Sequence, residues 1–184
     1  MVKMNEYYTP ALVLGVHPKN DKDAQFVLYT KDLGKIYATA KSVRKITSKL
    51  AGHLKIGSLL DARIVARGSS FQLIDGLSRG RWCGDSEILR FLKFLDDTIP
   101  QQQPDQRLWY TVREIVEGCK LGPSIYRYLL QLMGFTSSTQ DGLNCQGCRQ
   151  AKEFVYFYAP DIIFLCSECL SRVRIDTNEA VPIS

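Results

Sequence analysis

Four cysteines in the C-terminal part of the chain form two identical pairs that could bind a metal ion. Two residues separate Cys145 from Cys148 and Cys166 from Cys169, and seventeen residues lie between the pairs. Each Cys-x2-Cys pair places two sulfurs on one tight turn, so two such turns supply a closed tetrahedral set of thiolates. We therefore expect one structural Zn²⁺. Two disulfides, or four unrelated thiols, are the alternatives.

A closed four-thiolate site has no free position for a catalytic water, which disfavours a zinc-dependent hydrolase or nuclease. The sequence contains no Gly-x4-Gly-Lys loop for binding the phosphates of ATP. His17 and His53 have no neighbouring nucleophile, and they are expected to be surface or packing residues. We predict that the protein is not an enzyme and has no catalytic residues.

Basic residues are concentrated between Leu33 and Leu60, where six lysines and arginines occur without a single Asp or Glu. Such side chains neutralise phosphates and release condensed counterions, which gives sequence-independent affinity for nucleic acid. A solvated lysine-rich loop is the alternative. With two arginines further along the chain, the candidate DNA-binding residues are Lys35, Lys41, Arg44, Lys45, Lys49, Lys55, Arg63 and Arg67.

The charge of the chain is distributed unevenly. Residues 1–82 carry 14 basic and 6 acidic side chains, a balance of +8, whereas residues 83–184 carry 10 and 13, a balance of −3. The basic half favours a polyanionic partner. The longest aliphatic stretch, Ala11–Val16, is far too short to cross a bilayer, so we expect a soluble cytoplasmic protein without a membrane partner.

The first eighty residues have the pattern of a small β-barrel. Apolar and β-branched runs alternate with turn signals and predict five strands. The longest gap, residues 41–58, falls between the third and fourth strands, where a five-stranded oligonucleotide-binding (OB) barrel has its short helix or large loop. The expected strands are Thr9–Val16, Ala24–Thr30, Lys35–Ala40, Leu59–Arg67 and Phe71–Leu77.

After Trp82 the apolar period changes from two to about 3.6, which predicts three helices stopped by Pro100, Gly122 and Gly134. The apolar runs Phe154–Tyr158 and Ile162–Leu165 predict a hairpin between the cysteine pairs. The fold class is therefore α+β. The expected domains are an OB barrel at 1–82, a helical domain at 83–142, a zinc hairpin packed with the helical domain at 143–172, and a tail at 173–184.

The order of several segments resembles the RecO family of bacterial recombination mediators. Ala11–Leu14, Gly34–Ile36 and Ala40–Lys45 are similar to the barrel of that family, and Tyr128–Phe135 followed by the cysteines is similar to its helix-then-zinc order. The resemblance extends from about Pro10 to Cys169. Two departures are Asp161–Ile163, where the family has two glycines, and the fifteen residues after Cys169, where it adds further helices.

The resemblance implies a protein that binds single- and double-stranded DNA and anneals complementary strands without ATP during recombinational repair of DNA damage. Its implied partners are RecR, single-stranded-DNA-binding protein and, indirectly, RecA, in the cytoplasm and nucleoid of a bacterium. The shortened C-terminal part leaves no residues to name for the single-stranded-DNA-binding protein. An OB and zinc-ribbon module for RNA binding or transcription is the alternative function. The DNA contacts implied by the family are Lys35, Lys41, Arg44, Lys45 and Lys49, and its metal ligands are the four cysteines.

Overall fold

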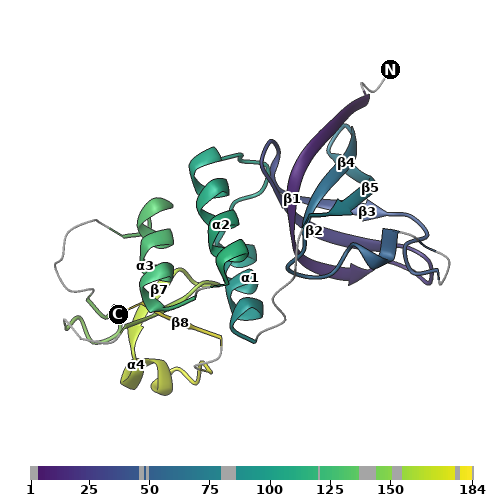
Figure 1. The fold of residues 1–184 in the computed structure, drawn as a ribbon. Coiled ribbons are helices and arrows are strands. Elements are labelled where there is room, and N and C mark those ends of the chain that lie inside the picture. Colours follow the sequence, from purple (N-terminus) through teal and green to yellow (C-terminus); the bar gives the residue numbers. More distant parts are fainter. Residues whose placement is uncertain are drawn as a thin grey trace. The chain divides into compact units, whose positions relative to one another are not determined.

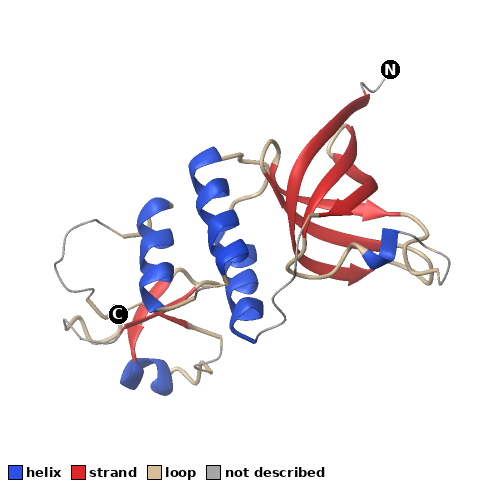
Figure 2. Cartoon of the chain, viewed as in Figure 1, coloured by secondary structure: helices blue, strands red, loops and turns tan. Residues whose placement is uncertain are grey.

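The chain forms two compact units, Met1–Cys119 and Lys120–Ser184, which are described separately (Figures 1 and 2). The computed structural model describes residues 4–45, 48, 50–79, 86–119, 121–136, 144–150, 155–176 and 179–183. Strands and helices are both present, as expected for an α+β fold. Among the described residues, no helix has the length and apolar character needed to span a membrane.

The division at Cys119 falls inside the range 83–142 that was expected to form one helical domain. Helices α1 (Ser86–Thr98) and α2 (Gln106–Gly118) belong to the unit that contains the barrel, whereas α3 (Pro123–Leu132) belongs to the unit that contains the cysteines. The domain boundaries expected from the sequence therefore stay a prediction.

Five strands close into a barrel with the order β1-β2-β3-β5-β4, which confirms the expected OB architecture. The second and fourth strands have the predicted bounds. The first is longer than predicted, because its first half pairs with β4 from Met4 opposite Arg67 to Leu12 opposite Leu59. The strands are β1 (Met4–Pro18), β2 (Ala24–Thr30), β3 (Gly34–Ala40), β4 (Leu59–Arg67) and β5 (Ser70–Ser78).

Alternate residues of each strand fill the barrel interior. A buried cluster that includes Val13, Leu28 and Ile36 forms this core. The connection between β3 and β4 contributes Val43 and Leu54 to the cluster, and it contains the short 3₁₀ helix η1 (Leu50–Gly52). The core therefore fixes both the strands and the basic connection.

Helices α1 and α2 belong to the same unit as the barrel and cover part of its outer surface. The ring of Trp109 on α2 meets the ring of Tyr29 on β2 edge to face, with centroids 5.4 Å apart. Both side chains are fully buried, and so is Leu12 on the outer side of β1. Helix α2 ends at Gly118, with Cys119 in the left-handed conformation (φ 50°), and not at the predicted Gly122.

The second unit contains the cysteines and a three-stranded sheet with the order β7-β6-β8. The predicted hairpin is present as β6 (Val155–Tyr158) paired antiparallel with β7 (Ile163–Cys166); Phe154 lies outside the described residues. Where the RecO pattern has glycines, Ile162 adopts a φ of 54°, so this β-branched residue is strained. Helix α4 (Ser167–Arg172) follows β7, and β8 (Val181–Pro182) lies against α3 and β6.

Candidate nucleic-acid interface and metal centre

Two loops of the barrel meet and bring their basic residues together. The backbone N–H of Arg44, after β3, donates to the carbonyl of Lys22 in the β1–β2 loop over 3.0 Å. The Arg44 guanidinium donates to the carbonyl of Asn20 over 2.6 Å. Lys19 Nζ reaches back from the β1–β2 loop to Thr39 Oγ1 on β3, 3.3 Å away. The position of the Arg44 side chain is therefore set by the neighbouring loop.

The carboxylate of Asp23 joins the same two loops. It accepts from the backbone N–H of Ser42 over 2.8 Å and from the side-chain amide of Asn20 over 3.0 Å. The hydrogen bond from Ser42, then that from Asn20, lower the pKa of Asp23, and the charges of Lys41 and Lys19 lower it further. Asp23 therefore stays ionised and holds the loops while lysines surround it.

We define the basic loop surface as Lys19, Lys22, Lys41, Arg44 and Lys45, all of which are exposed. Five cations share this surface with Asp21 and Asp23, so its formal balance is positive. Three of the predicted DNA contacts belong to it. Lys55, also exposed, follows Leu54 in the same β3–β4 connection, whereas Lys49 lies outside the described residues.

Lysines 19 and 22 were missed from the sequence, because their loop, Pro18–Asp23, has the pattern of an ordinary polar hairpin loop. It carries two lysines and two aspartates, so its net charge is zero. The topology of the barrel supplies the signal that could have identified them. Ala24 pairs with Ala40, so the β1–β2 loop lies where β3 ends. A basic run just after Ala40 must therefore lie beside that loop.

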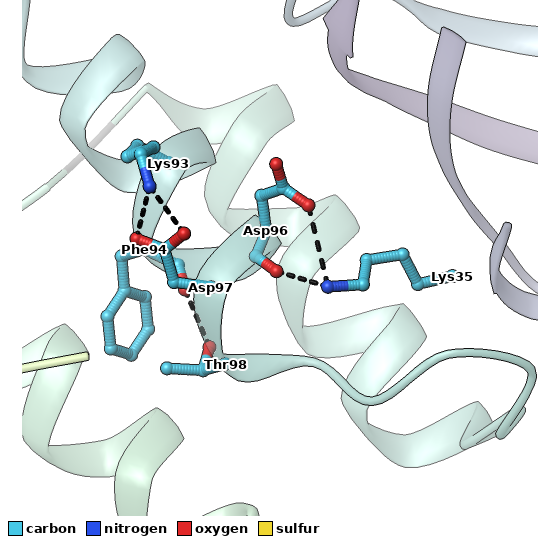
Figure 3. Close-up of polar contacts among 6 residues, drawn as sticks. All are labelled: Lys35, Lys93, Phe94, Asp96, Asp97 and Thr98. Carbon is cyan, nitrogen blue, oxygen red and sulfur yellow. Dashed lines mark hydrogen bonds and ion pairs between the residues drawn. The ribbon is translucent and has the colours of Figure 1, made fainter. Parts of the chain in front are cut away.

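Lys35 does not belong to the basic loop surface. The residue is buried, with 6% relative exposure. The ammonium donates to the main-chain carbonyl of Asp96 at the end of α1, and it lies 3.4 Å from that residue's carboxylate oxygen (Figure 3). The prediction that Lys35 contacts DNA is therefore wrong for this structure. The cause is α1, which covers the outer side of β3 at this position.

The adjacent carboxylates of Asp96 and Asp97 both have partners in the structure. Asp96 contacts Lys35, and the carboxylate of Asp97 accepts from the ammonium of Lys93, one helical turn earlier (Figure 3). Thr98 closes the helix by donating to the carbonyl of Phe94 over 2.7 Å. These contacts fix the end of α1 that holds Lys35.

Arg63 and Arg67 lie elsewhere on the barrel, on the exposed outer side of β4 beside the first half of β1. Arg63 forms an ion pair with Glu6, and its guanidinium lies 5.8 Å from the ring centre of Tyr8. The contact with Arg63, then that with Tyr8, lower the pKa of Glu6. The structure thus supplies Arg63 with its own counter-ion and does not join either arginine to the basic loop surface.

The four cysteines come together in the second unit. Cys145 and Cys148 lie on the turn before β6, Cys166 ends β7, and Cys169 is in α4. Their four Sγ atoms all lie within 4.8 Å of one another. A tetrahedral zinc with Zn–S bonds of about 2.3 Å needs sulfurs about 3.8 Å apart. The cluster therefore fits a zinc ion with only small adjustments.

Two further features of the cluster suit a metal centre. A Cβ atom on Gly147 would lie 2.9 Å from Sγ of Cys169, so only glycine leaves room for that sulfur. Burial opposes ionisation of Cys145, yet the backbone N–H groups of Cys166, Cys148 and Gly147 lower the pKa of its thiol to about 6. The N–H of Cys166 donates to this sulfur over 3.2 Å. The turn is therefore built to hold a thiolate.

The remaining sulfurs need a positive charge before they can all ionise. A hydrogen bond to Cys145, together with burial, raises the pKa of Cys169 to about 12. A divalent cation among four thiolates supplies such a compensating positive charge. The donor set, its spacing and the tight glycine therefore agree with a closed structural site.

Comparison with known proteins finds similar sequences for this chain. Residues 4–78 match the family model described as recombination protein O, N terminal. The DNA repair protein RecO of Thermodesulfovibrio yellowstonii is 25% identical over 189 residues, which cover 96% of this chain and 75% of that protein. The RecO protein of Dehalococcoides mccartyi strain BAV1 is 38% identical over 76 residues, 41% of this chain and 30% of the relative.

The matched region coincides with the closed barrel, β1 to β5. The longer alignment also takes in the part of the chain that carries the helices and the cysteine cluster. The N-terminal barrel of the chain is therefore similar to the N-terminal domain of the RecO family.

Proposed function

We propose that this protein binds single- and double-stranded DNA through the basic loop surface and anneals complementary strands without ATP. The observation that carries the proposal is the joining of the β1–β2 loop to the start of the β3–β4 connection through Asp23 and Arg44. This joining presents five cations on one surface of a barrel that matches the N-terminal model of the RecO family. The relatives' role in DNA repair supports nucleic acid as the polyanion.

The mechanism is electrostatic. Each lysine or arginine that contacts a phosphate releases condensed counterions and lowers the repulsion between two strands held on one surface. Complementary bases then meet at high local concentration and pair. Such catalysis needs no nucleophile and no nucleotide.

We propose that Cys145, Cys148, Cys166 and Cys169 hold one structural zinc ion. Bound there, the ion would cross-link the turn before β6 to β7 and α4, and so stabilise the second unit. In recombinational repair the protein would act with RecR and single-stranded-DNA-binding protein in loading RecA, in the bacterial cytoplasm. These partners follow from the family, and no residue of this chain is assigned to them.

A strand-annealing assay tests the proposal. Two complementary oligonucleotides with a fluorescent donor and acceptor are mixed without nucleotide, and the protein should accelerate their pairing. The variant with Lys41, Arg44 and Lys45 changed to Gln should lose most of this acceleration. Annealing by that variant at the wild-type rate would remove the basic loop surface from the mechanism.

The same assay with RNA strands of identical sequence addresses the alternative function in RNA binding. Equal or faster pairing of RNA would favour that alternative. Addition of RecR or single-stranded-DNA-binding protein from the same organism tests the partners, since a mediator should still anneal strands that are already coated by the latter protein.

A further inference from the structure

We propose that the open end of the barrel, beside the basic loop surface, binds one unstacked base of a single DNA strand. The inference rests on the proposed DNA binding and adds to it a pocket that distinguishes single strands from duplexes.

The pocket is a cavity of about 290 Å³ between the end of β1, the start of β2 and the β3–β4 connection. Its buried walls include Phe26, Val43 and Leu54. Exposed lining residues, Val16 and Ala51 among them, surround its mouth. The cavity is therefore apolar inside and accessible from the surface.

A β-bulge sets which residues of β1 line this end of the barrel. Pairing of β1 with β2 shifts between Val13 and Gly15, so one extra residue, Leu14, lies on β1. Beyond the bulge Val16 pairs with Phe26, and directly paired residues point to the same side of the sheet. Val16 therefore faces the barrel interior and lines the cavity, and it is nevertheless 39% exposed.

The positive charge beside the cavity indicates which kind of group binds in it. Arg44 is the charged residue among those that line it, and the guanidinium is held by its bond to the Asn20 carbonyl. Lys41 and Lys45 flank Arg44 in sequence and are exposed. An apolar space beside clustered cations suits a group with flat apolar faces attached to a phosphate, which is the chemistry of a nucleotide.

The size of the cavity and the cost of reaching it favour a base from a single strand. The cavity is close to the lower limit of small-molecule pockets, roughly 300 Å³, so it suits one base and not a larger group. A base inside a duplex is stacked and paired, and its extrusion costs a few kcal/mol. A base in a single strand avoids most of that cost, so the pocket should favour single strands.

The test fills the cavity without changing any charge. Val16→Phe and Ala51→Phe place an aromatic ring at exposed positions of the lining, where the fold tolerates added volume. Leu77→Phe, at a 61% exposed position of β5, is the matched control. The full chain is titrated by fluorescence anisotropy with oligothymidylate, an abasic oligonucleotide of equal length and a duplex of equal length. Thermal melting confirms that each variant is folded.

The wild type should bind oligothymidylate at least about fivefold more tightly than the abasic strand, the lower end of what one stacked base contributes. Val16→Phe and Ala51→Phe should lose that preference, with abasic and duplex binding unchanged. Wild-type behaviour of both variants, or an equal loss for all three ligands, would overturn the pocket and leave DNA binding standing. If the wild type binds none of the three, the proposed function itself fails.

Discussion

Lys35 on β3 and Asp96 on α1 form a charged contact that joins the barrel to the first helix. The Lys35 ammonium lies 3.4 Å from the Asp96 carboxylate and also donates to that residue's main-chain carbonyl. The lysine side chain is 7% exposed and the aspartate 25% exposed. A basic residue among the predicted DNA contacts is thus used to hold the fold together.

Lys35→Met should destabilise the protein and leave DNA affinity nearly unchanged. The change keeps the apolar stem and removes the ammonium, so the Asp96 carbonyl, in a partly buried contact, loses its charged donor. A hydrogen bond to a charged group contributes about 1.5 to 3 kcal/mol, and a loss of this size is expected. Urea unfolding, monitored by the fluorescence of Trp109 and Trp82, measures it.

Lys93→Met is the control for this experiment. Lys93 pairs with Asp97 on the helix surface, one turn away, and its side chain is 69% exposed. Exposed pairs of this spacing contribute only about 0.3 to 0.5 kcal/mol. Equal destabilisation by the two variants, or a strong loss of DNA binding in Lys35→Met alone, would contradict the structural role of Lys35.

The strands could be predicted from the sequence because alternation and turn residues are local signals. Ala24–Thr30 and Leu59–Arg67 have the expected bounds. The burial of Lys35 could not be predicted in this way. An outward position on a strand has the same sequence pattern whether a helix or water covers it. Only the packing of α1 and α2 on the barrel decides between those states.

The cysteine cluster was predictable from spacing alone, because two pairs of sulfurs have few alternative arrangements. The basic surface was only partly predictable. Its cations come from two loops, and the contribution of Lys19 and Lys22 depends on the bonds that Asp23 and Arg44 make between those loops. Such pairings are long-range and leave no periodic signal in the sequence.

The salt dependence of DNA binding should be set in part by the cations of the basic loop surface. With Lys41, Arg44 and Lys45 changed to Gln, the slope of log K against log salt for a single strand should become less steep by about 2, at about 0.7 per lost phosphate contact. Anisotropy titrations between low and moderate salt measure this slope.

The matched control removes the same number of charges from helices α1 and α2, as Lys93, Arg107 and Arg113 changed to Gln. This variant has the same net charge but keeps the loops intact. If both triple variants change the slope equally, binding depends on net charge alone and the surface has no special role.

The acid stability of the barrel should depend on Asp23. Hydrogen bonds from Ser42 and Asn20 hold its pKa below the ordinary value of 3.8, so the folded state binds the proton more weakly than the unfolded chain. This contribution is fully present above pH 5 and is lost as the pH falls through 3.8 and below. Asp23→Asn should therefore flatten the fall in unfolding free energy between pH 5 and pH 3.

Asp21→Asn makes the same charge change at an exposed position of the same loop. Urea midpoints of the wild type and both variants are compared across that pH range. A pH profile of Asp23→Asn that parallels the wild type would show that this carboxylate does not join the loops in solution.

Metal analysis of the purified chain should find one zinc ion per molecule. Its removal by a chelator should unfold the second unit, since binding of structural zinc is worth about 10 to 16 kcal/mol in small zinc modules. Hydrogen exchange should then accelerate at the amides of β6 and remain slow at those of β2. Less than half an equivalent of zinc, or unchanged exchange at β6, would count against the site.

Gly147→Ala should weaken zinc binding without removing a ligand. The added Cβ would lie 2.9 Å from Sγ of Cys169 and displace that sulfur. Competition with a chromophoric chelator measures the change in affinity. Gly122→Ala, in the same unit and with no atom within 4 Å of the added Cβ, is the control and should retain wild-type affinity.

Gly34 should tolerate no side chain, because two independent constraints act on it. Its φ is 68°, and an added Cβ would lie 2.6 Å from the backbone of Gln103. The left-handed conformation alone costs about 1 to 2 kcal/mol for a residue with a Cβ, and the contact with rigid backbone adds to it. Gly34→Ala should therefore lower the unfolding free energy by more than about 2 kcal/mol, measured in urea.

Gly52→Ala, whose Cβ would have no atom within 4 Å, should leave the unfolding free energy nearly unchanged. The two substitutions add the same methyl group, so their difference isolates the approach of Gln103 to β3. That approach also forms the hydrogen bond from the Gln102 N–H to the Lys35 carbonyl, 2.9 Å long. If Gly34→Ala is as stable as Gly52→Ala, the segment after α1 does not pack on β3, and the burial of Lys35 would lose its physical basis.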